Sequence, residues 1–453
     1  MALGRGRRRE EATSTRPPAD SHDPGTSRAP DGPPRGAVRL MLAPDFAAIF
    51  WGKLFASIAV WLHSIVAAIV VYDATGSAVA VGCVSVAQFG PQLVLTPWAG
   101  SRADRGNPVV QIFVGRLTCV LGSGALAVWL WAEDTASGPA VAAAVIVASL
   151  VVGLGFVLGG PAMQSMVPRI VTSQELSTAV ALNTLPLTAA RIGGPALGAV
   201  ISVHLGAAPA FATAAGLHLL FAVLVVIVKL PGRVPARPGV DYSIRTAIRY
   251  VAGDRVLLLA LVGIAAVGFG SEPSLTLAPS MAEELTSGGG GTLVGWLTAG
   301  FGLGAAVGLV LSTVVERRLG PGGEATAGLC LLAGGFLAVA LAPGEVVAVS
   351  GLAVAGMGFS WAMTGFSLEV QRHAPPMLLG RVMAFWLVGF VGARPVAAGV
   401  LGGLADVADV RTAFVGAAGL LAVAAVLCSP ALRSPRTRAG GRSRDRRDRG
   451  GPT

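Results

Sequence analysis

The region between residues 46 and 431 consists of long apolar stretches separated by short polar connections. A helix needs roughly 20 apolar residues to cross the hydrocarbon core of a bilayer, and these stretches have about that length. Charged residues make up 13% of the 453 residues, whereas soluble proteins carry about 25%. The stretches are also too long for the strands of a membrane barrel and lack a two-residue alternation. The sequence therefore predicts an all-α membrane protein and excludes a soluble enzyme, a disulfide scaffold and a disordered chain.

Twelve such stretches can be distinguished, and the longest polar interruption divides them into six and six. We expect twelve transmembrane helices in two pseudo-symmetric six-helix bundles, the first in residues 41–230 and the second in residues 256–432. The stretches lie near residues 46–71, 79–100, 109–131, 139–160, 178–202, 208–230, 256–279, 293–314, 325–342, 346–368, 380–402 and 412–431.

The basic residues predict the orientation of the chain, because cytoplasmic loops of membrane proteins are enriched in Lys and Arg. The two tails and the connections after the even-numbered stretches hold 29 Lys and Arg residues, and the connections after the odd-numbered stretches hold one, Arg411. Both termini are therefore expected on the cytoplasmic side of the cell inner (plasma) membrane. This pattern also accounts for the net charge of +10, so we expect no nucleic-acid partner.

Three segments lie outside the two predicted bundles. Residues 1–40 and 433–453 are rich in Arg, Pro, Gly, Ser and Asp, which predicts disordered basic cytoplasmic tails. Residues 231–255 form a cytoplasmic linker between the halves, and apolar residues among the arginines of its second part favour a short interfacial amphipathic helix.

The halves share traces of a repeat. The segment AARIGGPALGAV, which contains Arg191, is loosely repeated as GARPVAAGVLGG, which contains Arg394. Repeated halves with a binding site at their interface are typical of secondary transporters.

The sequence predicts neither a cofactor nor a metal site. The four cysteines fall inside apolar stretches, where they are expected to be small buried side chains. The five histidines have no paired spacing, and no phosphate-binding G-x-x-x-x-G-K-[ST] loop occurs. We therefore expect no ATP-driven mechanism and no enzymatic activity.

The connection after the second stretch reads GSRADRGN. Gly100, Ala103, Asp104 and Arg105 match the signature loop of the Major Facilitator Superfamily, which this segment resembles. The resemblance implies a cytoplasmic gating motif that holds the two halves together. The alternative is a tight polar turn between two helices.

The fifth stretch contains RIGGPALGA, in which Gly194, Pro195 and Gly198 resemble the motif of proton-coupled exporters within this superfamily. The proline removes one helical hydrogen bond and permits a bend, and the glycines allow close helix contact. The resemblance implies a preference for export, and the alternative is a kink that serves only packing.

A longer series of segments is similar to the enterobactin-exporter-like branch of the superfamily. The similarity covers nearly the whole chain except the tails. It includes PAMQ at 161–164, VP at 167–168, EL at 175–176, RYV at 249–251, GLG at 302–304 and GRV at 380–382.

Charged residues inside the bilayer are the strongest site candidates, because each is costly unless it is paired or hydrated. Glu272 lies in an apolar run just before Pro273. An apolar environment disfavours the charged form of a carboxyl group, so Glu272 is a candidate proton carrier. The alternative is a hydrated residue near the extracellular mouth. His63 is a second candidate for proton coupling, because imidazole titrates near neutral pH.

Arg191 and Arg394 are the mirrored cations of the two halves. They are candidates for pairing with Glu272 or with an anionic substrate, and the alternative is that they brace helix junctions. Lys53 and Arg116 lie nearer the cytoplasmic ends of their stretches, so we expect their side chains to extend toward water.

Aromatic and polar side chains within the stretches are candidates for lining a cavity. They are Trp61, Phe269, Trp361, Gln88 and Asn183.

Together these features predict a monomeric secondary transporter that alternates between inward-facing and outward-facing states. Its expected activity is the export of a small amphipathic organic molecule, such as a siderophore, an antibiotic or a metabolite, by proton antiport. The alternatives are an importer or uniporter of the same fold, and a non-transporting membrane sensor or lipid-handling protein.

Overall fold

The structure is a computed structural model that describes residues 35–133, 138–172, 174–175, 178–179, 182–183, 185–228, 230–231, 244–286, 290–375 and 378–429. These residues form α-helices and contain no strand. Eleven of the described helices are long and apolar enough to cross a membrane.

The first half begins with a short helix and continues with six long ones. The elements are α1 (Ala37–Leu42), α2 (Pro44–Thr75), α3 (Ala78–Arg105), α4 (Pro108–Ala132), α5 (Gly138–Ile170), α7 (Leu185–Leu205) and α8 (Ala207–Ile227). Because α1 starts at Ala37 and buries Leu40, the predicted N-terminal tail ends before residue 40. The rest of that tail, residues 1–34, lies outside the described residues.

The second half starts with α9 (Ile244–Gly253), a helix in the segment where an amphipathic helix was expected. It continues with α10 (Arg255–Gly270), α11 (Pro273–Thr276), α12 (Ala278–Thr286), α13 (Gly291–Ala340), α14 (Glu345–His373), α15 (Leu379–Val407) and α16 (Val410–Leu427). The predicted C-terminal tail and residues 232–243 of the predicted linker lie outside the described residues.

The segment labelled α13 comprises two membrane-spanning arms that are joined by a turn. It has 50 residues, which corresponds to about 75 Å at 1.5 Å per residue, against a hydrocarbon core of about 30 Å. The chain turns at Gly320, whose φ of 68° and ψ of 169° interrupt the helix, and Pro321 starts the next arm. The predicted stretches 293–314 and 325–342 occupy one arm each, so the described helices are consistent with the twelve spans that the sequence predicts.

Glycines allow helices of the second half to pack backbone against backbone. A Cβ atom on Gly304 of α13 would lie 1.8 Å from the Ala353 carbonyl oxygen of α14, and one on Gly308 would lie 2.7 Å from the Met357 carbonyl oxygen. Glycines at four-residue spacing therefore let α13 and α14 approach backbone to backbone.

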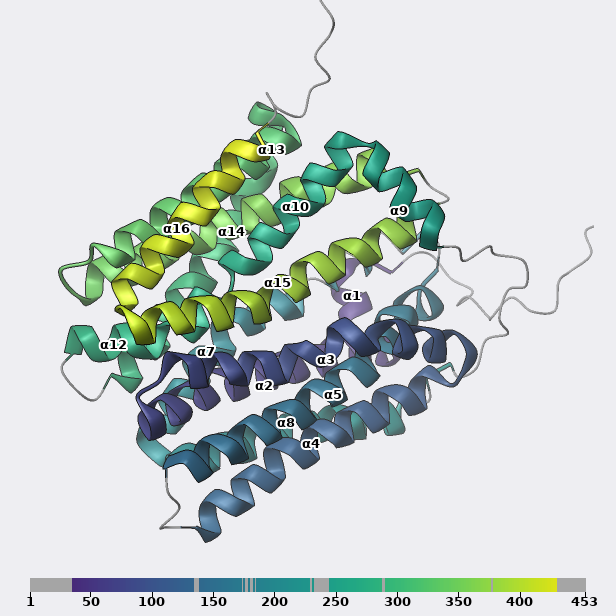
Figure 1. Cartoon of the computed structure of the whole chain (residues 1–453). Helices are drawn as coiled ribbons and strands as arrows, with labels where there is room; N and C mark the ends of the chain where they lie inside the picture. The colour runs from purple at the N-terminus through teal and green to yellow at the C-terminus, as the bar shows by residue number, and fades with distance from the viewer. Residues whose placement is uncertain are drawn as a thin grey trace, which may run out of the picture.

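The two halves lie side by side. In Figure 1 the helices of the first half, purple to blue, lie below the green and yellow helices α10, α14, α15 and α16 of the second half. Contacts between the halves join α3 to α15 and α7 to α13. We call the boundary between the halves the seam.

The seam is closed at one end of the bundle. At the end that carries α12, a Cβ on Gly402 would lie 2.7 Å from the Ala78 carbonyl oxygen, and one on Gly295 would lie 2.5 Å from the Ala199 Cβ. Toward the end that carries α9, α3 and α15 diverge (Figure 1). By the orientation that the basic residues predict, the α12 end is extracellular and the α9 end is cytoplasmic.

Candidate functional site

The site is built around a break between α10 and α11. Helix α10 ends at Gly270, and Pro273 starts α11 in the first helical position, where its missing N–H removes no helical hydrogen bond. Ser271 donates its hydroxyl to the Gly268 carbonyl oxygen at 2.7 Å. The break places Glu272 inside the protein, with 0% of its surface exposed.

Glu272 forms an ion pair with Arg394 of α15. The Arg394 Nε donates to Glu272 Oε2 at 2.9 Å, and the Thr276 hydroxyl donates to Glu272 Oε1 at 3.1 Å. Arg394 is 7% exposed, so both charges are withdrawn from water. Each therefore depends on the other for compensation.

Aromatic rings surround the guanidinium groups of the two arginines. The Arg394 guanidinium lies 3.7 Å from the Phe89 ring centroid and 5.9 Å from the Trp61 centroid. Arg191 lies 5.1 Å from the same Trp61 ring, and also contacts Phe301 and Phe359 at 5.3 and 4.1 Å. The Trp61 ring therefore lies near both arginines, which come from opposite halves.

The site lies on the seam. Trp61, Phe89 and Arg191 come from α2, α3 and α7 of the first half. The second half supplies Glu272 at the α10–α11 break, Arg394 from α15, and the two phenylalanines from α13 and α14. The interface between two halves of this kind is where secondary transporters place their substrate sites.

One protein-family model, described as transmembrane secretion effector, matches residues 40–446. The chain belongs to this family. The match covers both halves and every residue of the seam site. A similar protein, the uncharacterized MFS-type transporter y4rN of Sinorhizobium fredii, is 27% identical over 346 residues, which cover 72% of this chain and 80% of the relative. The resemblance to the Major Facilitator Superfamily is thereby confirmed: the protein is an MFS-type transporter and not an enzyme.

Solved transporter structures share the fold of this secretion-effector protein. A POT family transporter in complex with 5-aminolevulinic acid has a TM-score of 0.69 at 12% identity, covering 90% of this chain and 99% of that chain. A bacterial homologue of the human lysosomal transporter Spinster, in an inward-facing and unoccupied conformation, has a TM-score of 0.66 at 14% identity, with 85% and 96% of the chains covered. At this level of identity the likeness concerns the fold alone, and it supports the predicted all-α membrane bundle.

The predicted exporter motif in α7 packs against Trp61. A Cβ atom on Gly194 would lie 2.6 Å from the Trp61 Cβ, and one on Gly198 would lie 2.7 Å from a methyl carbon of Ile65. Pro195 lies between these two positions inside the helix. The motif therefore lets α7 pack directly on α2, and Arg191, which lies one helical turn before Gly194, contacts the Trp61 ring at 5.1 Å.

The remaining predicted cavity residues lie in several places. Gln88 is buried and accepts a hydrogen bond from the Ser64 hydroxyl, and Phe269 is buried in the last turn of α10. Trp361 donates its indole N–H to the Gly308 carbonyl oxygen at 3.0 Å. None of these three forms a hydrogen bond, ion pair or ring contact with Arg191 or Arg394 in the described part of the chain.

Asn183 lies apart from the seam site and binds Lys53. The Lys53 amine donates to the Asn183 backbone and side-chain oxygens at 2.8 and 2.9 Å. Lys53 is 7% exposed and Arg116 is 0% exposed, so the prediction that these side chains extend toward water is wrong. Polar oxygens inside the first half satisfy Lys53 instead, and the rings of Phe156 and Phe221 flank the Arg116 guanidinium.

His63 lies inside the first bundle. Its ring nitrogens bond to the hydroxyls of Ser123 and Ser149 at 3.0 and 3.1 Å, and the Phe211 ring packs against it. It is completely buried. The described interaction partners of His63 come from α4, α5 and α8, and among the described residues it makes no hydrogen bond or ring contact with the seam site.

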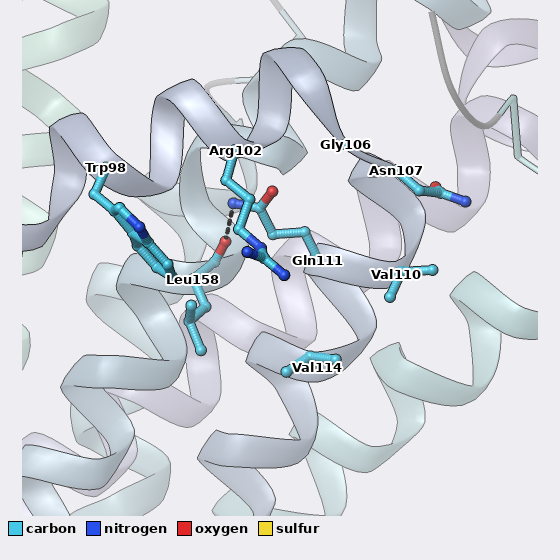
Figure 2. Close-up of a pocket in the computed structure, with 8 residues that line it drawn as sticks. All are labelled: Trp98, Arg102, Gly106, Asn107, Val110, Gln111, Val114 and Leu158. Carbon is cyan, nitrogen blue, oxygen red and sulfur yellow. Dashed lines mark hydrogen bonds between the residues drawn. The ribbon is translucent and has the colours of Figure 1, made fainter.

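The structure describes the predicted gating motif only in its backbone. Gly100, Asp104 and Arg105 lie in the last turns of α3, and their side chains lie outside the described residues. Next to them is a cavity of about 740 Å³ among α3, α4 and α5. Figure 2 shows Arg102 and Trp98 on one wall and Gln111 donating to the Leu158 carbonyl oxygen at 2.9 Å. This cavity contains none of the predicted site residues.

The contact between the halves at the α12 end is one that the sequence analysis missed. The Asp406 carboxylate accepts the backbone N–H groups of Ala78 and Val79 at 2.7 and 3.2 Å, and the Ser77 hydroxyl as well. Ser77 in turn caps α3 through the Ala80 N–H. Its N-cap position was the only sequence signal for this contact.

The described residues contain no group of three or more His, Cys, Asp or Glu side chains that could hold a metal ion.

Proposed function

We propose that this protein exports a small amphipathic organic molecule, of the siderophore, antibiotic or metabolite class, in exchange for protons. It works by alternating access in the inner (plasma) membrane, with both termini in the cytoplasm and each monomer a complete transporter. The similarity of its motifs to the enterobactin-exporter-like branch supports export, as does the Gly194, Pro195 and Gly198 motif of α7.

The ion pair between Glu272 and Arg394 is the observation that carries this proposal. Protonation of Glu272 removes its charge and leaves Arg394 buried without a carboxylate partner. Leaving one member of a buried pair unpaired destabilises a protein by about 3–5 kcal/mol. A proton entering down the membrane potential releases about 2.3 kcal/mol per 100 mV. The two energies are comparable, so proton entry is able to drive a change of conformation at this pair.

The position of the pair explains how that change reaches the seam. Glu272 lies at a break in the helix, and Arg394 lies on α15, which contacts α3 of the other half. Release of Arg394 from Glu272 therefore loosens an element that joins the two halves. Rocking of one half against the other then exposes the site alternately to the two sides of the membrane.

Transport into inverted membrane vesicles tests the proposal. Vesicles from cells that overproduce the full chain are given an acidic interior and a panel of amphipathic dyes, siderophores and organic acids. Wild-type vesicles are expected to accumulate the transported compound, and a protonophore is expected to abolish the accumulation. Glu272→Gln is expected to remove the effect of the pH gradient.

Glu324→Gln is the matched control. Glu324 is also a fully buried carboxyl group of the second half, but it binds the Ser312 hydroxyl and contacts neither Arg191 nor Arg394. Its loss is expected to leave gradient-driven uptake intact. Uptake that ignores both the gradient and the Glu272 substitution contradicts proton exchange, and gradient-driven loss of compound from the vesicles assigns the protein to import.

A further inference from the structure

Arg191 is a cation at the seam with no counter-ion. It forms neither a hydrogen bond nor an ion pair with any residue in the described ranges, and no carboxylate oxygen there lies within 4 Å of its guanidinium. Its contacts are the rings of Trp61, Phe301 and Phe359. Arg191 is nevertheless partly exposed, so a ligand is able to reach it.

The charges of the site do not cancel. Glu272 is neutralised by Arg394 at 2.9 Å, and Arg191 lies within electrostatic range of both. The three charged side chains therefore sum to one positive charge. A charge at this depth requires compensation, and ring faces provide only part of what a counter-ion provides.

In the part of the chain that the structure describes, no group accepts a hydrogen bond from Arg191. The guanidinium carbon lies 4.1 Å from the Phe359 centroid, within the range of a cation over a ring face. Ring faces offer no oxygen or nitrogen acceptor to the five N–H donors of the guanidinium. A guanidinium binds a carboxylate through two parallel hydrogen bonds.

The surrounding rings indicate the rest of the ligand. Trp61 comes from the first half, and Phe301 and Phe359 come from the second half. Trp61 is partly exposed, whereas Phe301 and Phe359 are 2% and 5% exposed. A planar apolar group attached to the anion therefore contacts all three rings once the two halves move apart, and it leaves no polar atom unsatisfied there. A simple inorganic anion makes no use of such walls.

We propose that the seam site binds an amphipathic organic anion, whose carboxylate pairs with Arg191 and whose planar apolar part packs against Trp61, Phe301 and Phe359. This inference rests on the proposed function, since it names the substrate class of the same site. Arg394 serves a different purpose, because its guanidinium is already engaged by Glu272.

Equilibrium binding of a matched pair of probes tests this inference. The full chain in lipid nanodiscs is titrated calorimetrically with 2-naphthoate and with 2-naphthamide, which have nearly the same shape and differ in charge. Wild-type protein is expected to bind the carboxylate at least about tenfold more tightly than the amide, the ratio that corresponds to one charged hydrogen-bonded pair. Arg191→Gln is expected to bind both probes equally weakly, and Arg191→Lys to recover part of the preference.

Arg372→Gln is the matched control, because Arg372 is an exposed arginine of α14 that pairs with Glu316 away from the seam. It is expected to retain the wild-type preference. Equal binding of the two probes by wild type, a preference that persists in Arg191→Gln, or no saturable binding of the carboxylate would each overturn the inference. No gradient is applied in this measurement, so failure of proton coupling leaves its outcome unchanged and the two proposals are tested separately.

Discussion

The Asp406 carboxylate of α15 accepts the backbone N–H of Ala78 in α3 at 2.7 Å, which joins the second half of the transporter to the first. Asp406 also binds the Val79 N–H and the Ser77 hydroxyl. The first turn of a helix has unsatisfied N–H groups and a partial positive charge. One carboxylate therefore closes the seam at the α12 end by capping a helix of the other half.

Replacement of Asp406 by Ala is expected to favour the state in which the α12 end is open. Loss of the three hydrogen bonds removes about 1–2 kcal/mol, which changes an equilibrium roughly 5- to 30-fold. The measurement is the labelling rate of Ala199→Cys by a membrane-impermeant maleimide, in a chain whose own cysteines are replaced. Ala199 is 3% exposed and packs against Gly295 at the seam, so faster labelling reports opening.

Asp409→Ala provides the comparison for this experiment. Asp409 also caps a helix, through the Thr412 N–H at 2.6 Å, but both residues belong to the second half. Its substitution is expected to leave the labelling rate of Ala199→Cys unchanged. Equal rates in the Asp406 variant and the parent protein would show that the cap does not hold the seam closed.

The contact between Arg35 and Glu175 is expected to make stability depend on acidic pH. The backbone N–H and the Nε of Arg35 both donate to Glu175 Oε1 at 2.8 Å, and its Nη2 donates to Oε2 at 3.0 Å. These bonds lower the pKa of Glu175 from 4.5 to about 2. The stabilisation is therefore complete above about pH 4.5 and is lost as the pH falls toward 2.

Glu175→Gln is expected to lower the melting temperature of the purified protein at neutral pH, and the difference from wild type is expected to shrink below about pH 4.5. Thermal unfolding in detergent between pH 7 and pH 3 measures it. Glu284→Gln is the control, since Glu284 pairs with Arg411 at an exposed site. A difference that stays constant down to pH 3 would refute the assignment.

Gly304→Ala is expected to destabilise the second half, because its Cβ would lie 1.8 Å from the Ala353 carbonyl oxygen. Overpacking of this kind costs about 1–3 kcal/mol. A Cβ on Gly334, in the other arm of α13, meets nothing within 4 Å. We therefore expect Gly334→Ala to leave the melting temperature unchanged or to raise it, since Ala favours helix. Equal effects of the two substitutions would contradict the close packing of α13 on α14.

The membrane architecture could be predicted from the sequence because it depends on local composition. Each apolar stretch is long enough to identify one helix by itself, and the six-and-six division follows from the position of residues 231–255. The turn at Gly320 inside α13 was predicted in the same way, as a polar gap between stretches 293–314 and 325–342. The boundary of the N-terminal tail was not, since α1 depends on the burial of Leu40 and on the contact of Arg35 with Glu175.

Glu272 and Arg394 could be selected from the sequence because charges are rare in spans. Their pairing could be anticipated only as one of several possibilities, since it depends on the rotation of α15 about its axis. The rotation of a helix about its axis also explains why the prediction for Lys53 and Arg116 failed. Their positions near helix ends suggested side chains that extend toward water, but both side chains are buried. Asp406 and Glu175 were missed as contacts because their partners lie far away in sequence.

Proton exchange through Glu272 is tested by the steady-state accumulation ratio of a transported compound in inverted vesicles, measured with and without an imposed proton gradient. With Glu272 and Arg394 intact, a gradient equivalent to 100 mV is expected to concentrate the substrate up to about fiftyfold for each proton exchanged. In Glu272→Gln the accumulation ratio is expected to stay at one, both with and without the proton gradient. Accumulation by the variant that still follows the gradient would show that Glu272 does not carry the exchanged proton.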